Sequence, residues 1–317
     1  MLNIGIDIGG TKIAGGVVDE RGEIIDQLRV ETPVDTTELS HAVADMANHL
    51  ADHHDVSAVG VAAAGFIDKS QSVVIHAPNI AWRDYPLRQT LQALISWPVT
   101  IENDANAAGW GEFRFGAGRD VDDMVMLTLG TGVGGAIMID GELFRGGHGI
   151  AGELGHVRFI RDGRRCGCGQ NGCLEQYASG RALQREADAI ADEGGERGRA
   201  LAAVRAEKGS ISGPAVSRLV LAGDAGAQEA LLRVATALGE ACGEFQAVLD
   251  PELFVIGGGV AQLGETLLQP VRIAYETALP GYGDRPVADF TIAKLGNDAG
   301  MIGAADLAGR ILVESRA

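Results

Sequence analysis

The sequence predicts an α/β protein that consists of two similar halves with a cleft between them. A strand, glycine turn, strand pattern at residues 2–18 returns at residues 124–139. Segments with strand character alternate with segments of helical periodicity, which is typical of α/β folds. The chain contains 46 glycines, about twice the usual frequency. Several glycine clusters follow predicted strands, so we expect these glycine turns to face the cleft.

The first half is expected to contain five strands, at residues 2–8, 13–18, 24–30, 56–63 and 99–101. Its helices are expected at residues 36–53, 86–96 and 105–113. The first of these helices has Thr36 or Thr37 as a candidate N-cap.

The second half is expected to contain strands at residues 124–129, 135–139, 253–256 and 290–293. Its main helices are expected at residues 175–192, 197–207, 214–223, 226–249 and 299–313. The predicted smaller domain combines residues 1–113 with 299–317, so that the C-terminal helix closes it. The predicted larger domain spans residues 114–298 and carries a zinc loop at 153–175.

Composition argues against several classes of protein. The net charge of −17 disfavours a nucleic-acid partner, because binding to phosphates needs a surplus of Lys and Arg. No apolar run reaches the roughly 20 residues of a membrane span, and the N-terminus does not read as a secretion signal. The cysteine pattern favours a reducing compartment, so we expect a cytoplasmic protein without a membrane partner.

Three of the four cysteines lie close together in the sequence and share their segment with a histidine. Soft thiolates and an imidazole in such a cluster indicate a closed, structural zinc site formed by His156, Cys166, Cys168 and Cys173. An oxidised cysteine pair and a zinc ribbon for macromolecular contacts are less favoured alternatives. Cys242 lies in an apolar helical run and is interpreted as a buried core thiol.

Glycine turns after strands are candidate phosphate sites. In the first, Asp7 can hold hydrated magnesium and the backbone can cradle phosphate. Each turn alone is also compatible with an ordinary hairpin or helix entry, but two similar turns in successive halves favour a shared polyphosphate ligand. No Walker-type motif is present. The candidate residues are Asp7, Gly9, Gly10, Thr11 and Lys12, then Gly130, Thr131, Gly132 and Gly134, and finally Gly257, Gly258 and Gly259.

A carboxylate follows the strand at 99–101. Asp104 is placed to act as a general base toward a substrate hydroxyl, with Asn103 as a hydroxyl ligand. Either residue could also cap the following helix, and the two roles are compatible. Glu102 and Glu112 are interpreted as surface or structural residues.

Together these motifs resemble the ROK family (repressors, open reading frames and kinases) of the actin, hexokinase and Hsp70 ATPase superfamily. Residues 7–12 and 129–135 resemble its two phosphate motifs, and residues 257–259 resemble its adenosine motif. The run from Glu153 to Glu175 is similar to its sugar and zinc signature. Residues 61–68 and 77–83 look most like the actinobacterial glucokinases within the family. The resemblance implies two actin-like (ribonuclease H-like) domains.

The resemblance also implies site roles. Asp104 would be the catalytic base that takes the proton of the sugar 6-hydroxyl as this attacks ATP, which is bound with Mg²⁺. Zn²⁺ would orient the sugar loop rather than catalyse. The residues implied to bind or line the sugar are Gly65, Asn79, Asn103, Asp104, Glu153, His156 and Glu175.

Glucose is the expected hexose, with N-acetylglucosamine, N-acetylmannosamine, mannose, fructose and allose as alternatives. Polyphosphate is a less favoured donor. A sugar-responsive repressor is disfavoured, since such proteins place a helix-turn-helix before the first phosphate motif, which begins here at Asp7. We expect a homodimer or homotetramer.

Overall fold

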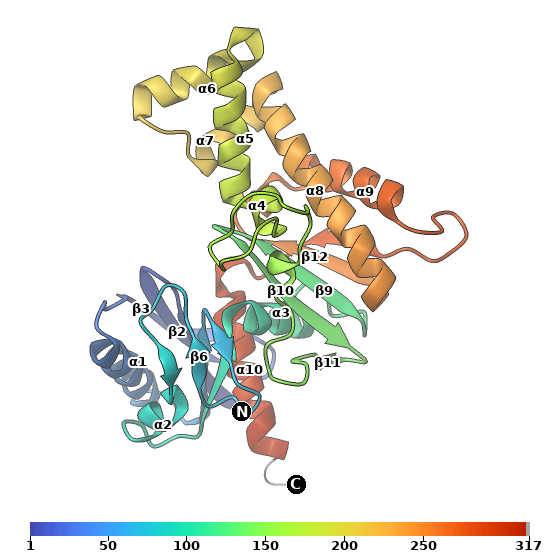
Figure 1. Cartoon of the computed structure of the whole chain (residues 1–317). Helices are drawn as coiled ribbons and strands as arrows, with labels where there is room; N and C mark the ends of the chain where they lie inside the picture. Colours follow the sequence, from blue (N-terminus) through green and yellow to red (C-terminus); the bar gives the residue numbers. More distant parts are fainter. Residues whose placement is uncertain (315–317) are drawn as a thin grey trace. The chain divides into compact units, whose positions relative to one another are not determined.

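The chain folds into two compact units (Figure 1). In the computed structural model, which describes residues 1–314, unit 1 contains Met1–Asp122, Ala136–Gly152 and the described residues from Lys294 onward. Unit 2 contains Asp123–Gly135 and Glu153–Ala293. The units differ from the predicted domains at residues 114–122, 136–152 and 294–298, which the prediction gave to the larger domain and the contacts give to unit 1.

Unit 1 contains a five-stranded sheet in the order β3-β2-β1-β4-β8. Its strands are β1 (Leu2–Ile8), β2 (Lys12–Val18), β3 (Ile24–Glu31), β4 (Val56–Ala63) and β8 (Val99–Asn103). Strands β1, β4 and β8 run parallel, and β2 and β3 form an antiparallel edge. The carboxyl ends of the three parallel strands therefore meet at one edge, where Asp7 is the penultimate residue of β1 and Asn103 ends β8.

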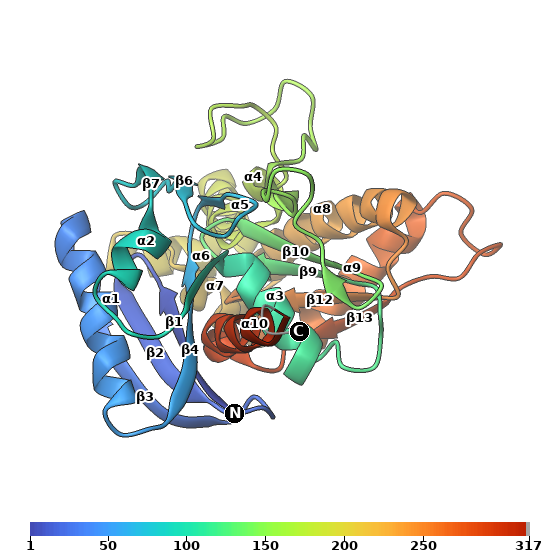
Figure 2. The same cartoon turned by 90° about the horizontal axis from the view of Figure 1, so that it is seen from below.

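Helices cover both faces of this sheet (Figure 2). Helices α1 (Thr36–Ala51) and α2 (Leu87–Gln92) share one apolar core with β1, β2 and β4. Helices α3 (Asp104–Phe115) and α10 (Ala299–Glu314) pack on the other side through small residues such as Ala62, Ala107 and Ala304. A sheet covered on both faces explains why its parallel strands read as nearly continuous apolar runs.

The structure corrects the predicted start of α1. Asp35, rather than Thr36 or Thr37, is the N-cap, and its carboxylate accepts hydrogen bonds from the backbone N–H groups of Thr37 and Glu38. An aspartate in extended conformation before the first turn satisfies these free donors as well as a threonine would. Helix α2 also ends at Gln92, earlier than the predicted 96.

A small second sheet in unit 1 was not predicted. It contains β5 (Phe66–Ile67), β6 (Val74–His76) and β7 (Arg83–Tyr85), in that order. Strands of two or three residues are too short to show the alternation on which sequence-based assignment depends.

The other large sheet has the order β11-β10-β9-β12-β13. Its strands are β9 (Met124–Leu129), β10 (Val133–Ile139), β11 (Glu142–Leu143), β12 (Leu253–Gly257) and β13 (Asp289–Ile292). In chain order, both large sheets place their strands as third, second, first, fourth and fifth. This shared topology confirms the prediction of two similar α/β sheets.

The helices of unit 2 are α4 (Glu175–Ala178), α5 (Gly180–Glu193), α6 (Gly195–Lys208), α7 (Gly213–Leu221), α8 (Ala225–Leu249) and α9 (Glu265–Ala278). The single helix predicted at 175–192 is wrong, because Ser179 is extended between α4 and α5 and its hydroxyl caps α5 at the N–H of Ala182. The rings of Phe254, Tyr275 and Phe290 pack α9 against β12 and β13.

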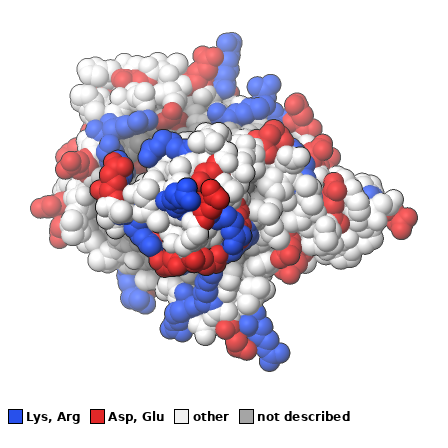
Figure 3. Space-filling model, turned by 90° about the horizontal axis from the view of Figure 1, so that it is seen from above, with Lys and Arg blue, Asp and Glu red and all other residues white. Residues whose placement is uncertain are grey.

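Short 3₁₀ helices complete the chain at η1 (Leu154–His156), η2 (Val260–Leu263) and η3 (Gly296–Asp298). Among the residues that the structure describes, no helix has the length and apolar character needed to cross a membrane. On the face drawn in Figure 3, Lys and Arg side chains are interspersed with Asp and Glu.

Candidate functional site

The four predicted metal ligands come together in unit 2. The side-chain ligand atoms of His156, Cys166, Cys168 and Cys173 all lie within 4.8 Å of one another. Cys168 Sγ is 3.6 Å from Cys173 Sγ, and Cys166 Sγ is 3.7 Å from His156 Nδ1. Sulfurs bound tetrahedrally at the usual Zn–S distance would be about 3.8 Å apart. All four cysteines of the chain are free, so the arrangement fits Zn²⁺ and not a disulfide.

Short backbone contacts shape the loop that presents these ligands. Isolated β-bridges join Arg158 to Cys173 and Arg165 to Asn171. Within the second bridge, the Cys166 N–H donates to the carbonyl of Gln170 over 2.8 Å. The loop therefore doubles back on itself and brings ligands that are up to 17 positions apart in sequence to one point.

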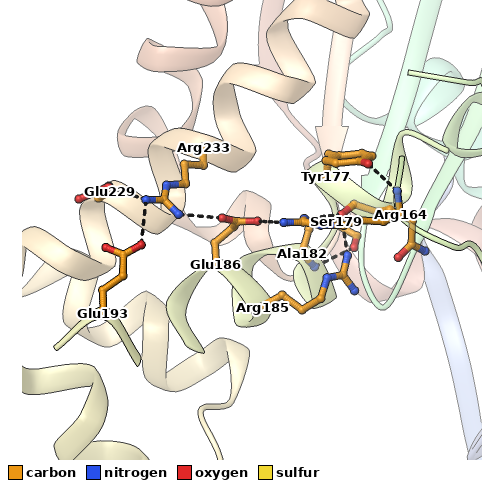
Figure 4. A network of polar contacts seen from close by, with 10 residues as sticks. Arg164, Tyr177, Ser179, Ala182, Arg185, Glu186, Glu193, Glu229 and Arg233 are labelled. Carbon is orange, nitrogen blue, oxygen red and sulfur yellow. Dashed lines mark hydrogen bonds and ion pairs between the residues drawn. The ribbon is translucent and has the colours of Figure 1, made fainter. Parts of the chain in front are cut away.

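Arg164 fastens the loop to the helices of unit 2 (Figure 4). Its Nη2 donates to Glu186 Oε1 over 2.7 Å, its N–H donates to the hydroxyl of Tyr177, and its guanidinium lies 5.0 Å from the centre of the Tyr177 ring. Glu186 accepts a further hydrogen bond from Arg233 of α8 over 3.0 Å. Burial by itself would raise the pKa of Glu186, but the hydrogen bonds from Arg164 and Arg233 outweigh it and lower the pKa.

The predicted sugar acids of unit 2 border this cluster. His156 Nε2 lies 3.9 Å from Glu153 Oε2, while its Nδ1 faces the sulfurs. A carboxylate beside the free nitrogen of a metal-binding histidine fixes the ring orientation. Glu175 Oε1 is 2.9 Å from Cys166 Sγ. On its other side, a side chain at Gly132 would approach Glu175 Oε2 to 2.5 Å, so Glu175 joins the cluster to the second glycine turn.

A cavity of about 650 Å³ opens within unit 2 beside that turn. Its lining contains Gly130 and Thr131 from the turn and Gly259 from the glycine run, but not Gly132, Gly134, Gly257 or Gly258. Gly258 instead packs against Leu129, which lines the cavity. It has φ +85°, and a Cβ there would lie 2.5 Å from the carbonyl oxygen of Leu129.

Polar and charged side chains of two helices line the same cavity and were missed by the sequence analysis. They are Arg181 and Gln184 on α5 and Ser217 and Arg218 on α7. No local motif marks these residues. The cavity is large enough for a nucleotide-sized ligand, and its backbone turn and arginines suit an anion at one end.

The first predicted phosphate turn lies in unit 1. The Gly9 N–H donates to the Lys12 carbonyl, and Thr32 Oγ1 donates to the Gly9 carbonyl over 2.7 Å. Gly10, Thr11 and Lys12 are exposed at its tip. Behind the turn, burial and the nearby charge of Asp104 raise the pKa of Asp7 from 3.8 to about 7.

Asp104 begins α3, directly after β8. Burial raises the pKa of its carboxyl group. Asn103 caps the helix, because its Oδ1 accepts the N–H of Asn106 over 3.0 Å, and its Nδ2 donates to the carbonyl of Gly65 over 3.0 Å. The structure thus joins Asn103 to Gly65, while Asn79 is an exposed residue of the loop between β6 and β7.

Glu102 and Glu112 are not surface residues. Their exposed fractions are 2% and 0%. Glu112 accepts backbone hydrogen bonds from Ala117, Lys294 and Leu295, so the structural interpretation applies. Glu102 lies in β8, where polar residues alternate with Val99 and Ile101, so no local pattern in the sequence indicated its burial.

Comparisons with known proteins show which family the chain resembles. The sequence model of the ROK family matches residues 3–311. A glucokinase of Streptomyces coelicolor is 44% identical over 308 residues, which is 97% of each chain. An N-acetylmannosamine kinase of Vibrio cholerae is 35% identical over 295 residues, covering 90% of this chain and 95% of the relative.

A solved structure is similar over nearly the whole fold. It is a ROK family glucokinase from Streptomyces griseus in complex with glucose and AMPPNP, with a TM-score of 0.88 and 44% sequence identity. The match covers 98% of this chain and 100% of that one. The two sheets of equal topology, the Cys₃His cluster and these matches lead to one conclusion: the chain belongs to the ROK family.

Proposed function

We propose that this protein transfers the γ-phosphoryl group of ATP to the 6-hydroxyl of glucose, giving glucose 6-phosphate and ADP. The observation that carries the proposal is the similarity, at 44% identity over 98% of the chain, to the Streptomyces griseus glucokinase that binds glucose and AMPPNP. The candidate residues of both units supply chemistry that suits such a reaction.

In unit 1, Asp104 is the proposed catalytic base and takes the proton of the sugar 6-hydroxyl. Its place at the start of α3 and the partial burial of its side chain support this role, because burial raises its pKa and so makes it a better proton acceptor. Asn103 is the proposed ligand of a neighbouring hydroxyl, and its hydrogen bond to the Gly65 carbonyl holds its amide in place.

The nucleotide is proposed to bind the cavity of unit 2, with its phosphates at the glycine turns. The lining by Gly130, Thr131 and Gly259 supports this assignment. Asp7, a carboxylate beside the first turn, suits Mg²⁺ as an oxygen ligand. When bound, Mg²⁺ would neutralise charge on the phosphates.

Glu153, His156 and Glu175 are proposed to bind the remaining sugar hydroxyls, and Gly65 and Asn79 to line the sugar site. The contacts of Glu153 with His156 and of Glu175 with Cys166 support a role of the metal cluster in orienting these acids. Zn²⁺ would hold the loop in shape. Four protein ligands leave it no open position for substrate.

A coupled kinase assay with ATP tests the proposal. The panel should contain glucose, mannose, fructose, allose, N-acetylglucosamine and N-acetylmannosamine, since N-acetylmannosamine kinases are among the relatives. We expect the highest kcat/KM with glucose. A preference for an N-acetylhexosamine would replace glucose as the substrate, and no turnover of any sugar would refute the kinase assignment.

Asp104→Asn tests the proposed base. Turnover should fall by about 10² to 10⁴, while glucose binding measured by calorimetry should stay within a few-fold of the unmodified protein. Unchanged turnover would remove Asp104 from its role. A homodimer or homotetramer and a cytoplasmic location stay predictions, and light scattering of the purified protein tests the first.

A further inference from the structure

Glu102 is a buried carboxylate in unit 1 that collects four hydrogen bonds. Its Oε1 accepts the N–H of Asn103 over 2.9 Å and Nδ2 of Asn106 over 3.1 Å. Its Oε2 accepts Nε2 of Gln71 over 3.0 Å and Nε of Arg145 over 2.6 Å. Every partner is a donor, and the side chain is only 3% exposed.

Only a side chain that accepts hydrogen bonds at both terminal atoms suits this environment. A carboxylate can accept at both oxygens, whereas an amide places two N–H donors where one oxygen stood. With glutamine at this position, the amide group would face donors from at least one side, and a buried unmade hydrogen bond is costly. Arg145 supplies the compensating charge that a buried carboxylate needs.

The four donors come from separate parts of unit 1. Asn103 and Asn106 form the start of α3, beside Asp104. Gln71 belongs to the turn between β5 and β6 and has φ +53°, a left-handed conformation that a side-chain contact helps to maintain. Arg145 follows β11 and lies eight positions before Glu153.

The segment after Arg145 is also tightly seated. The Ala151 N–H donates to the Arg145 carbonyl over 3.1 Å. A Cβ on Gly149, which has φ +90°, would lie 2.5 Å from the backbone nitrogen of Lys69. The segment therefore packs against the same turn that carries Gln71, and Glu102 links the turn, the segment and the start of α3.

We propose that Glu102 is a positioning residue for sugar binding, which holds Asn103 in place and, through Arg145, sets the course of the segment that leads to Glu153. The inference rests on the proposed function, because both Asn103 and Glu153 are proposed sugar ligands. Glu102 itself has all its acceptor positions filled by protein donors, so it acts through its neighbours and does not touch substrate.

The test measures steady-state kinetics of Glu102→Gln, Arg145→Met and the double variant, with glucose and ATP varied separately. We expect Arg145→Met to raise the KM for glucose about ten-fold and Glu102→Gln to lower kcat/KM for glucose at least about thirty-fold. The KM for ATP should stay within about two-fold. Because the two side chains act as a unit, the double variant should be little worse than Glu102→Gln alone.

Arg88→Met is the matched control. Arg88 donates to Ser70 and Ser72 in the same turn but does not touch Glu102, so its kinetic constants should stay within about two-fold. If Glu102→Gln does not fold, the variants Arg145→Met and Gln71→Leu test the positioning role instead, because each removes a single donor to Glu102.

Three results would overturn the inference. One is a glucose KM in Arg145→Met equal to that of Arg88→Met, and another is an equal rise of KM for both substrates. The third is a double variant whose loss of kcat/KM equals the product of the losses in the two single variants. An inactive unmodified protein would instead refute the proposed function and remove the positioning role with it.

Discussion

The partly buried carboxyl group of Asp7 should make unit 1 less stable as the pH rises, and Asp7→Asn should remove this effect. The pKa of Asp7 is raised from 3.8 to about 7 by burial and by the charge of Asp104. Between these two pH values the folded chain keeps a proton that the unfolded chain has lost. The folded state therefore binds more protons, and the free energy of unfolding falls as the pH rises through this window.

The magnitude follows from the two pKa values. Moving a carboxyl pKa from 3.8 to about 7 corresponds to about 4 kcal/mol of lost stability at pH 8, of which about 1 to 2 kcal/mol is already lost at pH 5. Asparagine has nearly the same shape and no charge. Between pH 5 and pH 8, Asp7→Asn should therefore gain about 3 kcal/mol relative to the unmodified protein, or about 6 to 12 °C in Tm for a unit of this size.

Calorimetric melting at pH 5, 6, 7 and 8 measures this effect, with zinc retained and without magnesium or nucleotide. Asp45→Asn is the control, because Asp45 is an exposed residue of α1 in the same unit, and its Tm difference should not depend on pH. A constant Tm offset between Asp7→Asn and the unmodified protein at all four pH values would refute the reasoning. Adding Mg²⁺ and ATP should stabilise the unmodified protein more than the variant, since a bound cation favours the ionised carboxylate.

Other perturbations test unit 2. Cys168→Ser should bind well below one zinc per chain, as measured by mass spectrometry, and should raise the KM for glucose about 10-fold or more. The control Cys242→Ala should keep its zinc. Full zinc content with a normal KM in Cys168→Ser would argue against a structural zinc. Glu186→Gln should lower the free energy of unfolding by about 1 to 2 kcal/mol and speed the release of zinc to a chromogenic chelator, with a smaller effect at high salt. An unchanged release rate would show that the contact between Arg164 and Glu186 does not stabilise the zinc loop. Gly258→Ala should raise the KM for ATP about 10-fold or more, since a left-handed alanine costs about 1 to 2 kcal/mol before any clash; a normal KM for ATP would separate this turn from nucleotide binding.

Much of the fold could be predicted from the sequence because its signals are local. The strands at 2–8 and 56–63 have the limits that their apolar runs predict. The start of α3 at Asp104 follows from an asparagine cap placed before an alanine-rich helix. The metal ligands could be predicted as well, because thiols and an imidazole in a short segment have few other uses.

Other features could not be predicted, because their causes lie far away in the chain. The break between α4 and α5 at Ser179 accompanies a hydrogen bond from the Gly180 N–H to the Gly130 carbonyl, 50 positions upstream. The arginines of the unit 2 cavity belong to helices whose local pattern shows only an amphipathic surface.

The sequence alone determined most of the long helices and strands, the type of the two large sheets, the metal ligands and the candidate base, since periodicity and ligand chemistry act over a few residues. Only the tertiary structure decided the environment of Glu102 and the raised pKa of Asp7. Burial and hydrogen bonding depend on partners such as Gln71, Arg145 and Asp104, which the fold brings close although the chain separates them by tens of residues.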